Sequence, residues 1–151
     1  MIELRPITPE NHLQARKLSV RADQERWVAS IDKSLADAFV WQGASFRIAY
    51  VDDVPVGFIL IFPFAAGEER VVVNIVRLMI DARFQGRGLG RELLNETLDW
   101  ISSLAPPVDC IRISTLPDNE VALTLYKSGG FQERGIEEGE IALYREVYRR
   151  D

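Results

Sequence analysis

Three arginines and three glycines gather in a short segment between a predicted strand and a predicted helix: Arg83, Gly86, Arg87, Gly88, Gly90 and Arg91. Glycines at a helix N-terminus let backbone N–H groups face outward, and the helix dipole adds positive charge there. Such N–H groups bind phosphate, and the arginines supply local positive charge in a chain whose net charge is −5. The segment therefore predicts a site for a dianionic pyrophosphate.

Two well-known nucleotide-binding loops do not fit this segment. A P-loop ends in Gly-Lys-Ser/Thr, and no such triplet follows here. A dinucleotide-binding loop has the spacing Gly-x-Gly-x-x-Gly after a first strand, whereas this chain has Gly-x-Gly-x-Gly from residue 86. The alternative without a ligand is a tight strand-to-helix turn that carries surface arginines.

A second group of reactive side chains lies about thirty residues later in the sequence. Asn119 and Tyr126 are seven residues apart on a predicted helix, which places them two turns apart on one face. A phenol with a pKa of about 10 can protonate a thiolate whose conjugate acid has a pKa of about 8.5. Tyr126 is therefore a candidate general acid, and the alternative is a half-buried aromatic residue with no chemical role.

The hydrophobic pattern predicts the elements that position these residues. Strands are expected at residues 2–5, 46–51, 54–62, 71–81, 110–115, 131–133 and 141–147. Helices are expected at residues 9–19, 34–42, 89–101 and 117–128, with a capping box of Ser34 and Asp37 at the second one. A turn is expected at residues 67–69. The order βαα-ββ-β-α-β-α-β-β predicts a single α+β domain with a mixed sheet over residues 1–151.

Composition excludes several classes of site. The single cysteine, Cys110, excludes an internal disulfide and a cysteine-rich zinc site, and the single histidine, His12, excludes a two-histidine metal site. Acidic net charge argues against nucleic-acid binding and favours cationic small molecules. The start of the chain has no secretory pattern, and no uncharged stretch reaches the roughly 20 residues of a membrane span. We therefore expect a cytoplasmic protein without metal or membrane contacts.

The pattern Gln85-x-x-Gly88-x-Gly90 after a strand resembles the acyl-CoA pyrophosphate loop of the GNAT superfamily of N-acetyltransferases. The later run Asn119-x-x-Ala122-x-x-Leu125-Tyr126, followed by Gly-Gly-Phe, is similar to the second signature of that family. The resemblance implies a central, mostly antiparallel sheet flanked by helices. It also implies acetyl-CoA as co-substrate and direct attack of an amine on the thioester.

The resemblance further implies roles for individual residues. Backbone groups of Leu78, Met79 and Ile80 would pair with the pantetheine arm, Asn119 would hydrogen-bond that arm, and Tyr126 would lie near the thioester sulfur. The pyrophosphate would be held by the amides of one continuous segment: Gln85, Gly86, Arg87, Gly88, Leu89, Gly90 and Arg91. A backbone N–H at a bulge of the central strand would stabilise the oxyanion.

One departure from the family concerns the general base. Many members carry a glutamate on the central strand that takes the proton of the amine, whereas residues 71–80 of this chain contain no carboxylate. Two routes remain open at this stage. Water can relay the proton to a more distant acid, or the amine can bind in its neutral form.

Three segments resemble one branch, the bacterial spermine/spermidine (diamine) N-acetyltransferases: residues 24–38, 77–86 and 137–141. This resemblance implies a polyamine substrate, a homodimer, and substrate contacts from Glu25, Trp27 and Glu138. Further candidates to bind ammonium groups are the acidic residues Asp23, Asp37, Glu137 and Glu140. The alternatives are a capping role for Asp37 and a solvated turn for the glutamates at 137, 138 and 140. Two alternatives stay open: acetylation of another amine (an aminoglycoside, an amino acid or a protein N-terminus), and a non-catalytic sensor that binds acyl-CoA.

Overall fold

A seven-stranded sheet forms the centre of the molecule in a computed structural model, which describes residues 1–64 and 70–147. The strands are β1 (Glu3–Arg5), β2 (Ser45–Val51), β3 (Val54–Phe64), β4 (Val72–Ile80), β5 (Cys110–Thr115), β6 (Gln132–Glu137) and β7 (Glu140–Glu146). Their order in space is β1-β2-β3-β4-β5-β7-β6, and all neighbours are antiparallel except β4 and β5. The expected mixed fold with a mostly antiparallel sheet is confirmed. The turn expected at residues 67–69 lies outside the described ranges.

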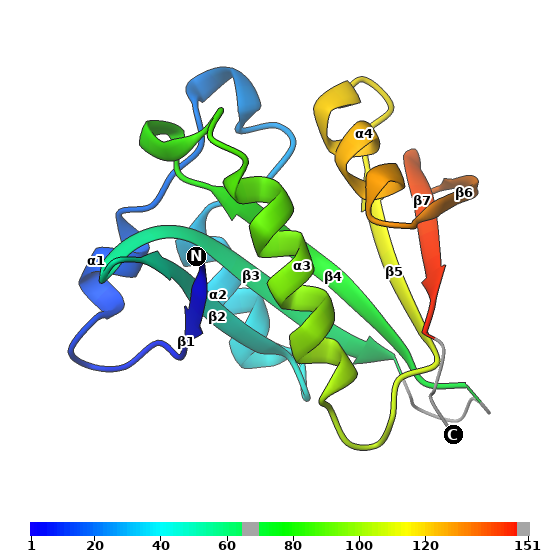
Figure 1. Ribbon diagram of the computed structural model, residues 1–151, viewed down its shortest axis with the longest axis horizontal. Helices are drawn as coiled ribbons and strands as arrows, with labels where there is room; N and C mark the ends of the chain where they lie inside the picture. The colour runs from blue at the N-terminus through cyan, green and yellow to red at the C-terminus, as the bar shows by residue number, and fades with distance from the viewer. Residues whose placement is uncertain (65–69, 148–151) are drawn as a thin grey trace.

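Helices cover both faces of this sheet (Figure 1). The elements are α1 (His12–Arg16), α2 (Ile31–Val40), α3 (Leu89–Ser102) and α4 (Glu120–Ser128), with short 3₁₀ turns η1 (Ala22–Gln24) and η2 (Ala82–Phe84). One core cluster packs α1 and α2 against the sheet, and the other packs α3 and α4 against the opposite face. In α3, an apolar face is buried that includes Leu93, Leu94, Leu98 and Ile101, and Leu89 packs against it partly buried. The two helical layers hold the segments that precede α3 and α4 beside the middle of the sheet (Figure 1).

β4 and β5 separate after a short common ladder. The two parallel strands pair from Val72 with Cys110 to Ile75 with Ile113, and no later pair joins them. β4 nevertheless continues to Ile80 on its other side, where it pairs with β3. The second half of β4 therefore presents a strand edge that β5 does not cover. A wedge-shaped opening results in the middle of the sheet.

A β-bulge in β4 lies where this opening begins. The register with β3 passes from Ile75 directly to Arg77, so Val76 is the extra residue. Before the bulge, Ile75 packs on the α3 and α4 face, whereas after it Met79 packs on the α2 face. The bulge thus reverses which face the odd-numbered residues occupy. Arg77 consequently points toward α2 instead of into the core beneath α3.

The first two helices differ from the sequence expectation. The first helix was expected at residues 9–19, but α1 has only five residues. The Ser19 N–H donates to Asp81, and the Ser19 carbonyl accepts from Ala82, so tertiary hydrogen bonds end the helix early. α2 begins earlier than expected because Ser30 is its N-cap and accepts from the Lys33 N–H at 3.1 Å.

The expected capping box of Ser34 and Asp37 is therefore wrong. Ser34 lies inside α2, where its hydroxyl donates to the Ser30 carbonyl at 2.8 Å. At the start of α4, the N-cap is Asn119, and the helix begins at Glu120 instead of residue 117. Both helices start where an oxygen-bearing side chain can accept a hydrogen bond from a free backbone N–H.

Candidate active site

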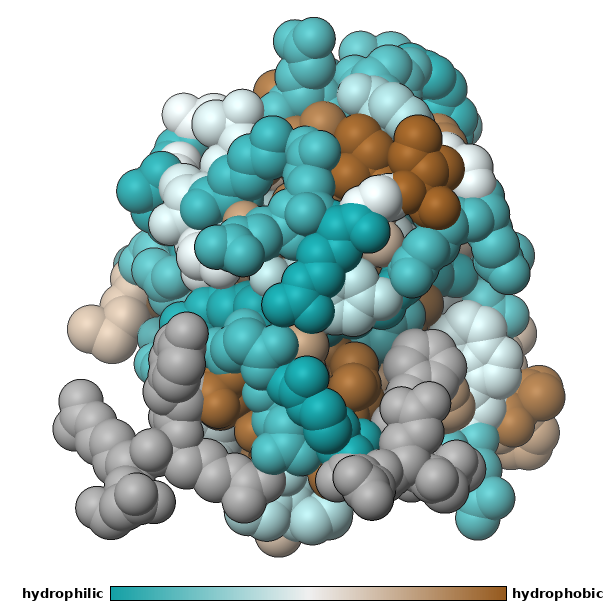
Figure 2. All heavy atoms as spheres, turned by 90° about the vertical axis from the view of Figure 1, so that its right-hand side faces the viewer, coloured by the Kyte–Doolittle hydropathy of each residue, from teal (hydrophilic) through white to brown (hydrophobic). Residues whose placement is uncertain are grey.

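A cavity of about 1200 Å³ occupies the opening between β4 and β5. Trp41, which packs with the α2 layer, and Tyr126, which packs with the α3 and α4 layer, both line it. The cavity therefore extends through the sheet from one face to the other. Figure 2 shows the side that carries α4, β6 and β7, which is largely hydrophilic, with one group of hydrophobic atoms in its upper part and further ones in its lower half. Val121 of α4 lines the cavity and is 81% exposed, so the entrance has an apolar rim.

The glycine-rich segment forms one end of the cavity. Gly86 and Gly88 have φ values of +78° and +79°, and a Cβ atom added at either would meet no atom within 4 Å. Gly88 is the N-cap of α3 and supplies no side-chain acceptor, so the first N–H groups of that helix face open space. This cradle fits an anionic group such as a pyrophosphate.

A reciprocal pair of amides supports this loop. The Gln85 amide donates to Gln24 at 2.9 Å, and the Gln24 amide donates to Gln85 at 3.2 Å. Gln85 also donates to the Ile80 carbonyl at 2.9 Å. Its side chain therefore ties the loop to η1 and to the end of β4. Both glutamines line the cavity.

The three arginines of the segment have different environments. Arg83 forms an ion pair of 2.8 Å with the buried Asp81. Burial alone would raise the pKa of Asp81, but hydrogen bonds from Arg83 and from the Ser19 N–H outweigh it and lower that pKa. Arg87 lies over the Phe84 ring at 5.7 Å and does not line the cavity. Arg91 alone of the three lines it.

Tyr126 and Asn119 line the cavity from α4. Tyr126 is 7% exposed, and burial, with a smaller contribution from the charge of Glu140, raises its pKa to about 12. This value is above the pKa of about 10 of a solvent-exposed tyrosine side chain. Burial also disfavours a thiolate in the same cavity, so it would raise the pKa of a bound thiol as it raises that of the Tyr126 phenol. Asn119 accepts from the Ala122 N–H at 3.3 Å, so its carbonyl oxygen caps the helix and its amide N–H₂ remains a donor.

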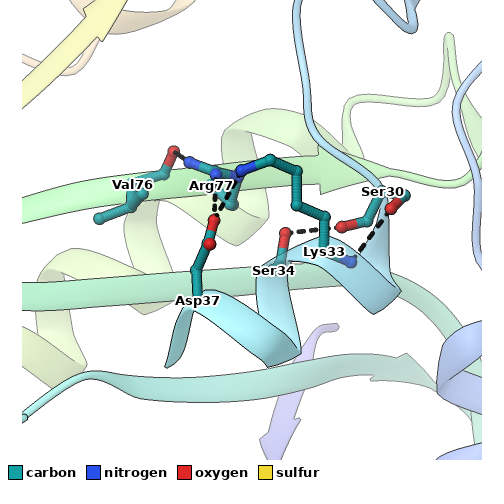
Figure 3. Close-up of polar contacts among 6 residues, drawn as sticks. All are labelled: Ser30, Lys33, Ser34, Asp37, Val76 and Arg77. Atoms are coloured by element: carbon teal, nitrogen blue, oxygen red, sulfur yellow. Dashed lines mark hydrogen bonds and ion pairs between the residues drawn. The ribbon is translucent and has the colours of Figure 1, made fainter. Parts of the chain in front are cut away.

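An ion pair joins β4 to α2 beside the bulge (Figure 3). Arg77 donates to Asp37 at 3.1 Å and to the Val76 carbonyl at 3.1 Å, and Lys33 donates to the same carboxylate at 2.9 Å. The Nε atom of Arg77 is buried and has no hydrogen-bond partner among the described residues. Burial lowers the pKa of Arg77, although the charges of Asp37 and Glu140 oppose that effect. Arg77 also lines the cavity.

The β6–β7 hairpin closes the other end of the cavity. Arg112 of β5 donates to Glu137 at 2.6 and 2.9 Å and to Asn74 at 3.2 Å. The bonds from Arg112 to Glu137 are the main cause of the lowered pKa of that carboxyl group. Glu138 and Glu140 line the cavity from the turn and from the first residue of β7.

Of the remaining candidate residues from the sequence, one lines the cavity and another does not. Trp27 lines the cavity and donates from its indole N–H to Asp118 at 3.0 Å. Glu25 is exposed and is not among the residues that line the cavity. Sequence reasoning did not single out Arg112, because an arginine on a predicted buried strand carries no motif. The side chains of β5 alternate between the two faces of the sheet, so Arg112 lies on the face opposite to that of Ile111 and Ile113. This alternation was the signal that could have singled it out.

The described residues contain no cluster of three His, Cys, Asp or Glu side chains that could hold a metal ion. In the same residues, no helix is long and apolar enough to cross a membrane.

Comparison with known proteins agrees with this geometry. The profile of the Acetyltransferase (GNAT) family matches residues 9–131. The chain belongs to the GNAT family. This GNAT chain is 29% identical over 139 residues to spermine/spermidine N(1)-acetyltransferase of Bacillus subtilis, a match that covers 89% of this chain and 90% of the relative. The family assignment from the two sequence signatures is therefore confirmed.

The chain is also similar to two proteins whose names do not mention a polyamine. N-alpha-acetyltransferase RimI of Mycobacterium tuberculosis is 40% identical over 57 residues, which cover 38% of this GNAT chain and 33% of RimI. Arabidopsis thaliana Naa50, solved with the bisubstrate analogue CoA-Ac-MVNAL, is 25% identical with a TM-score of 0.70 over 97% of this chain and 99% of the solved chain. The chain spans 15% and 33% of the length of the first two curated relatives that it matches.

Proposed function

We propose that this chain transfers the acetyl group of acetyl-CoA to a primary amine, and that the acceptor is a polyamine such as spermidine or spermine. The distribution of charge along the cavity carries the proposal. Arg21 pairs with Asp23, Arg112 with Glu137, and Arg77 with Asp37. Among the described residues of the lining, the charged side chains outside these pairs are Arg91, Glu138 and Glu140. Positive charge thus remains at the glycine end and negative charge at the hairpin end.

The glycine end suits the pyrophosphate of acetyl-CoA. The segment from Gln85 to Arg91 would hold it through the free N–H groups of α3 and the open space at Gly86 and Gly88. The uncovered edge of β4, at residues 78–80, would pair with the pantetheine arm. The Asn119 amide would donate to that arm. When bound, acetyl-CoA supplies a thioester whose carbonyl carbon is the electrophile.

The hairpin end suits a cationic acceptor. Glu138 and Glu140 would attract an ammonium group, and Trp27 and Trp41 offer aromatic surface to an alkyl chain or a second cation. The match over nine-tenths of a spermine/spermidine acetyltransferase supports this choice of acceptor. A chain of net charge −5 would also steer a polycation toward the cavity over several ångströms.

Two groups of the protein would assist the transfer. A backbone N–H beside the bulge at Val76 would donate to the carbonyl oxygen as negative charge develops on it. The Tyr126 hydroxyl would donate its proton to the departing sulfur. Tyr126 lines the cavity from α4, on the opposite side from α2.

A thiol-release assay with acetyl-CoA and a panel of amines tests the proposal. The panel contains spermidine, spermine, an aminoglycoside, free amino acids and a peptide that begins with methionine. Turnover that is fastest with the polyamines supports it, and kcat/KM for spermine should then fall with added salt, because the Debye length shrinks from about 10 Å at 0.1 M to about 3 Å at 1 M. Turnover only with the peptide would overturn the choice of acceptor but not acetyl transfer. Binding of CoA without any turnover would identify an acyl-CoA sensor.

Two expectations from the sequence stay predictions. A homodimer would be detected by light scattering coupled to size-exclusion chromatography, as twice the mass of 17.1 kDa. A cytoplasmic location would be tested by fractionation of cells that express the tagged protein.

A further inference from the structure

Glu140 brings a carboxylate into the cavity from β7, across from the strand on which many relatives carry one. β4 contains no acidic residue between Val72 and Ile80. Glu140 lines the same cavity as Arg77, which follows the β4 bulge, and as Tyr126 of α4. Its charge acts on both of those side chains. The carboxylate therefore belongs to the same cavity as the residue after the bulge and the candidate general acid.

The hairpin holds Glu140 in this place through its backbone. Glu140 pairs with Glu137 at the end of the β6–β7 ladder, and the next residue, Ile141, pairs with Thr115 at the end of β5. The connecting turn consists of Glu138 at φ +50° and Gly139 at φ +81°, values typical of a tight two-residue hairpin. Two ladders and a short turn thus fix the Cα of Glu140.

The other acidic side chains of the lining are tied or exposed. Asp23 pairs with Arg21, and Glu137 accepts from Arg112 and from the Tyr144 hydroxyl. Glu138 is exposed at the turn. Glu140 is half-buried, and no hydrogen bond or ion pair within 4.0 Å joins its carboxylate to the described residues. It is therefore the half-buried carboxylate that remains available to a ligand.

We propose that Glu140 binds the reacting ammonium group and accepts its proton, either directly or through one water molecule, opposite the general acid Tyr126. The inference rests on the proposed acetyl transfer and applies to any amine acceptor. It answers the question that the missing carboxylate of β4 leaves open. In this chain the general base would therefore be on the first residue of β7 and not on the central strand β4.

The ammonium group gives one proton to Glu140, which passes it to bulk water through the cavity entrance. The freed nitrogen lone pair forms the C–N bond, and the C–S bond breaks with its electron pair on sulfur. Tyr126 protonates that sulfur, and the tyrosinate recovers a proton from the nitrogen of the new amide. One ammonium and one thioester thus give one amide, one thiol and one released proton.

The charged groups around Glu140 affect this transfer. Arg77 faces it from β4 and Arg112 lies on β5, while Glu137 and Glu138 belong to its own hairpin and Tyr126 faces it from α4. Asp37 offsets the charge of Arg77, and Glu137 offsets that of Arg112. The proton of the amine therefore passes to Glu140, whose carboxylate has no such partner among the described residues.

The test compares Glu140→Gln with a matched control, Glu133→Gln, which removes an exposed β6 carboxylate paired with Lys127 outside the cavity. The probe is the amine of the panel that the wild type acetylates fastest, with spermidine tried first. We expect kcat/KM for the amine to fall at least 100-fold at pH 7 in Glu140→Gln, with KM for acetyl-CoA unchanged. The loss should shrink as the pH rises toward the pKa of the free amine, because neutral amine then needs no base. A loss below threefold, or an equal loss at every pH, would overturn the proposal.

A second measurement needs no acceptor. Ultraviolet titration of the tyrosines, with the Tyr126→Phe spectrum subtracted, isolates the ionisation of Tyr126. Removal of the neighbouring negative charge should lower the pKa of Tyr126 in Glu140→Gln relative to the wild type. An unchanged pKa would place Glu140 away from the phenol and overturn the proposal. If no amine of the panel is acetylated, the proposed function fails, while this titration still decides the placement of Glu140.

Discussion

Trp27 and Asp118 are 91 residues apart in the chain, and the indole N–H of the first donates to the carboxylate of the second at 3.0 Å. Arg26 forms an ion pair with the same carboxylate. Hydrogen bonds from Arg26 and Trp27 lower the pKa of Asp118. These contacts join the segment after η1 to the turn before α4, which are two walls of one cavity. Exposed polar contacts therefore hold together two segments that both contribute residues to the cavity lining.

Trp27→Phe should loosen this connection and leave most of the aromatic surface in place. We expect KM for the acceptor to rise about threefold to tenfold with kcat nearly unchanged, since one hydrogen bond is lost. Steady-state kinetics at saturating acetyl-CoA measure this. Trp100→Phe is the control, because Trp100 lies on α3 outside the cavity. An equal rise of KM in both variants would contradict a specific role for Trp27.

Gly88→Val should block the anion cradle. A branched side chain at φ +79° is strained and would fill the space in front of the first N–H groups of α3. We expect the Kd for CoA, measured by calorimetry, to rise at least tenfold. Gly135→Val introduces a side chain at φ +114° in β6, away from the cavity, and controls for backbone strain. Unchanged CoA affinity in a folded Gly88→Val variant would show that the pyrophosphate binds elsewhere.

Tyr126→Phe should remove a proton donor without disturbing the fold. We expect kcat to fall by roughly 10²–10⁴-fold, the usual contribution of a general acid, and KM for acetyl-CoA to change little. Tyr144→Phe is the control, since it also removes a tyrosine hydroxyl, one that donates to Glu137, while Tyr144 itself does not line the cavity. More than about a third of the wild-type kcat in Tyr126→Phe would mean that water protonates the sulfur.

Stability at alkaline pH should also depend on Tyr126. Its pKa is about 12 in the folded protein and about 10 in an unfolded chain, so the folded state retains the proton more tightly. This contribution is complete below about pH 10 and is lost as the pH rises to about 12; two pKa units correspond to roughly 3 kcal/mol. Urea unfolding at pH 8, 10 and 11 should show a steeper loss in the wild type than in Tyr126→Phe. Parallel losses would place the phenol in contact with bulk solvent.

Asp37→Asn should leave the Arg77 guanidinium without its anionic partner. The Arg77 side chain is 16% exposed and that of Asp37 is 23% exposed, so we expect a loss of about 1–3 kcal/mol in the free energy of unfolding. Lys33→Met removes the more exposed partner of Asp37 and should cost less than about 0.5 kcal/mol. The double variant Asp37→Asn/Arg77→Met should recover part of the loss in urea unfolding. Additive losses would show that the two side chains are not coupled.

Local sequence signals were sufficient for the glycine-rich segment, for the buried face of α3 and for the strand Cys110–Thr115. In each of these segments, the spacing of glycine or apolar residues matches the exposure or burial that the fold gives them. The bulge at Val76 could not be predicted, because it depends on the register between β4 and β3. Without the bulge, alternation would place Arg77 on the face of Ile75, away from Asp37. A single inserted residue therefore decides which charges meet beside the site.

The start of α2 shows a second limit of local patterns. Ser30 and Ser34 are both followed three residues later by residues compatible with a helix start, and the true cap is the earlier one. Burial decides between them, since Ser34 is 1% exposed and satisfies its hydroxyl within the helix. Because Ser30 is the cap, the Asp37 carboxylate does not cap the helix, and it pairs with Arg77. The polar contacts between distant segments, such as Gln24 with Gln85, had no signal in the sequence.

The parting of β4 from β5 gives this sheet two free edges in its interior, where most sheets have them only at the rim. Unpaired strand edges recruit other extended chains, and folded proteins usually shield them. Here residues of α4 and of the glycine-rich segment line the cavity between these edges. The amides of residues 77–80 should exchange with deuterium faster than those of residues 57–60 on β3, and CoA should slow the former selectively. Bound CoA would thus supply hydrogen-bond partners to the unpaired edge of β4 and stabilise the sheet, in addition to providing the acetyl group.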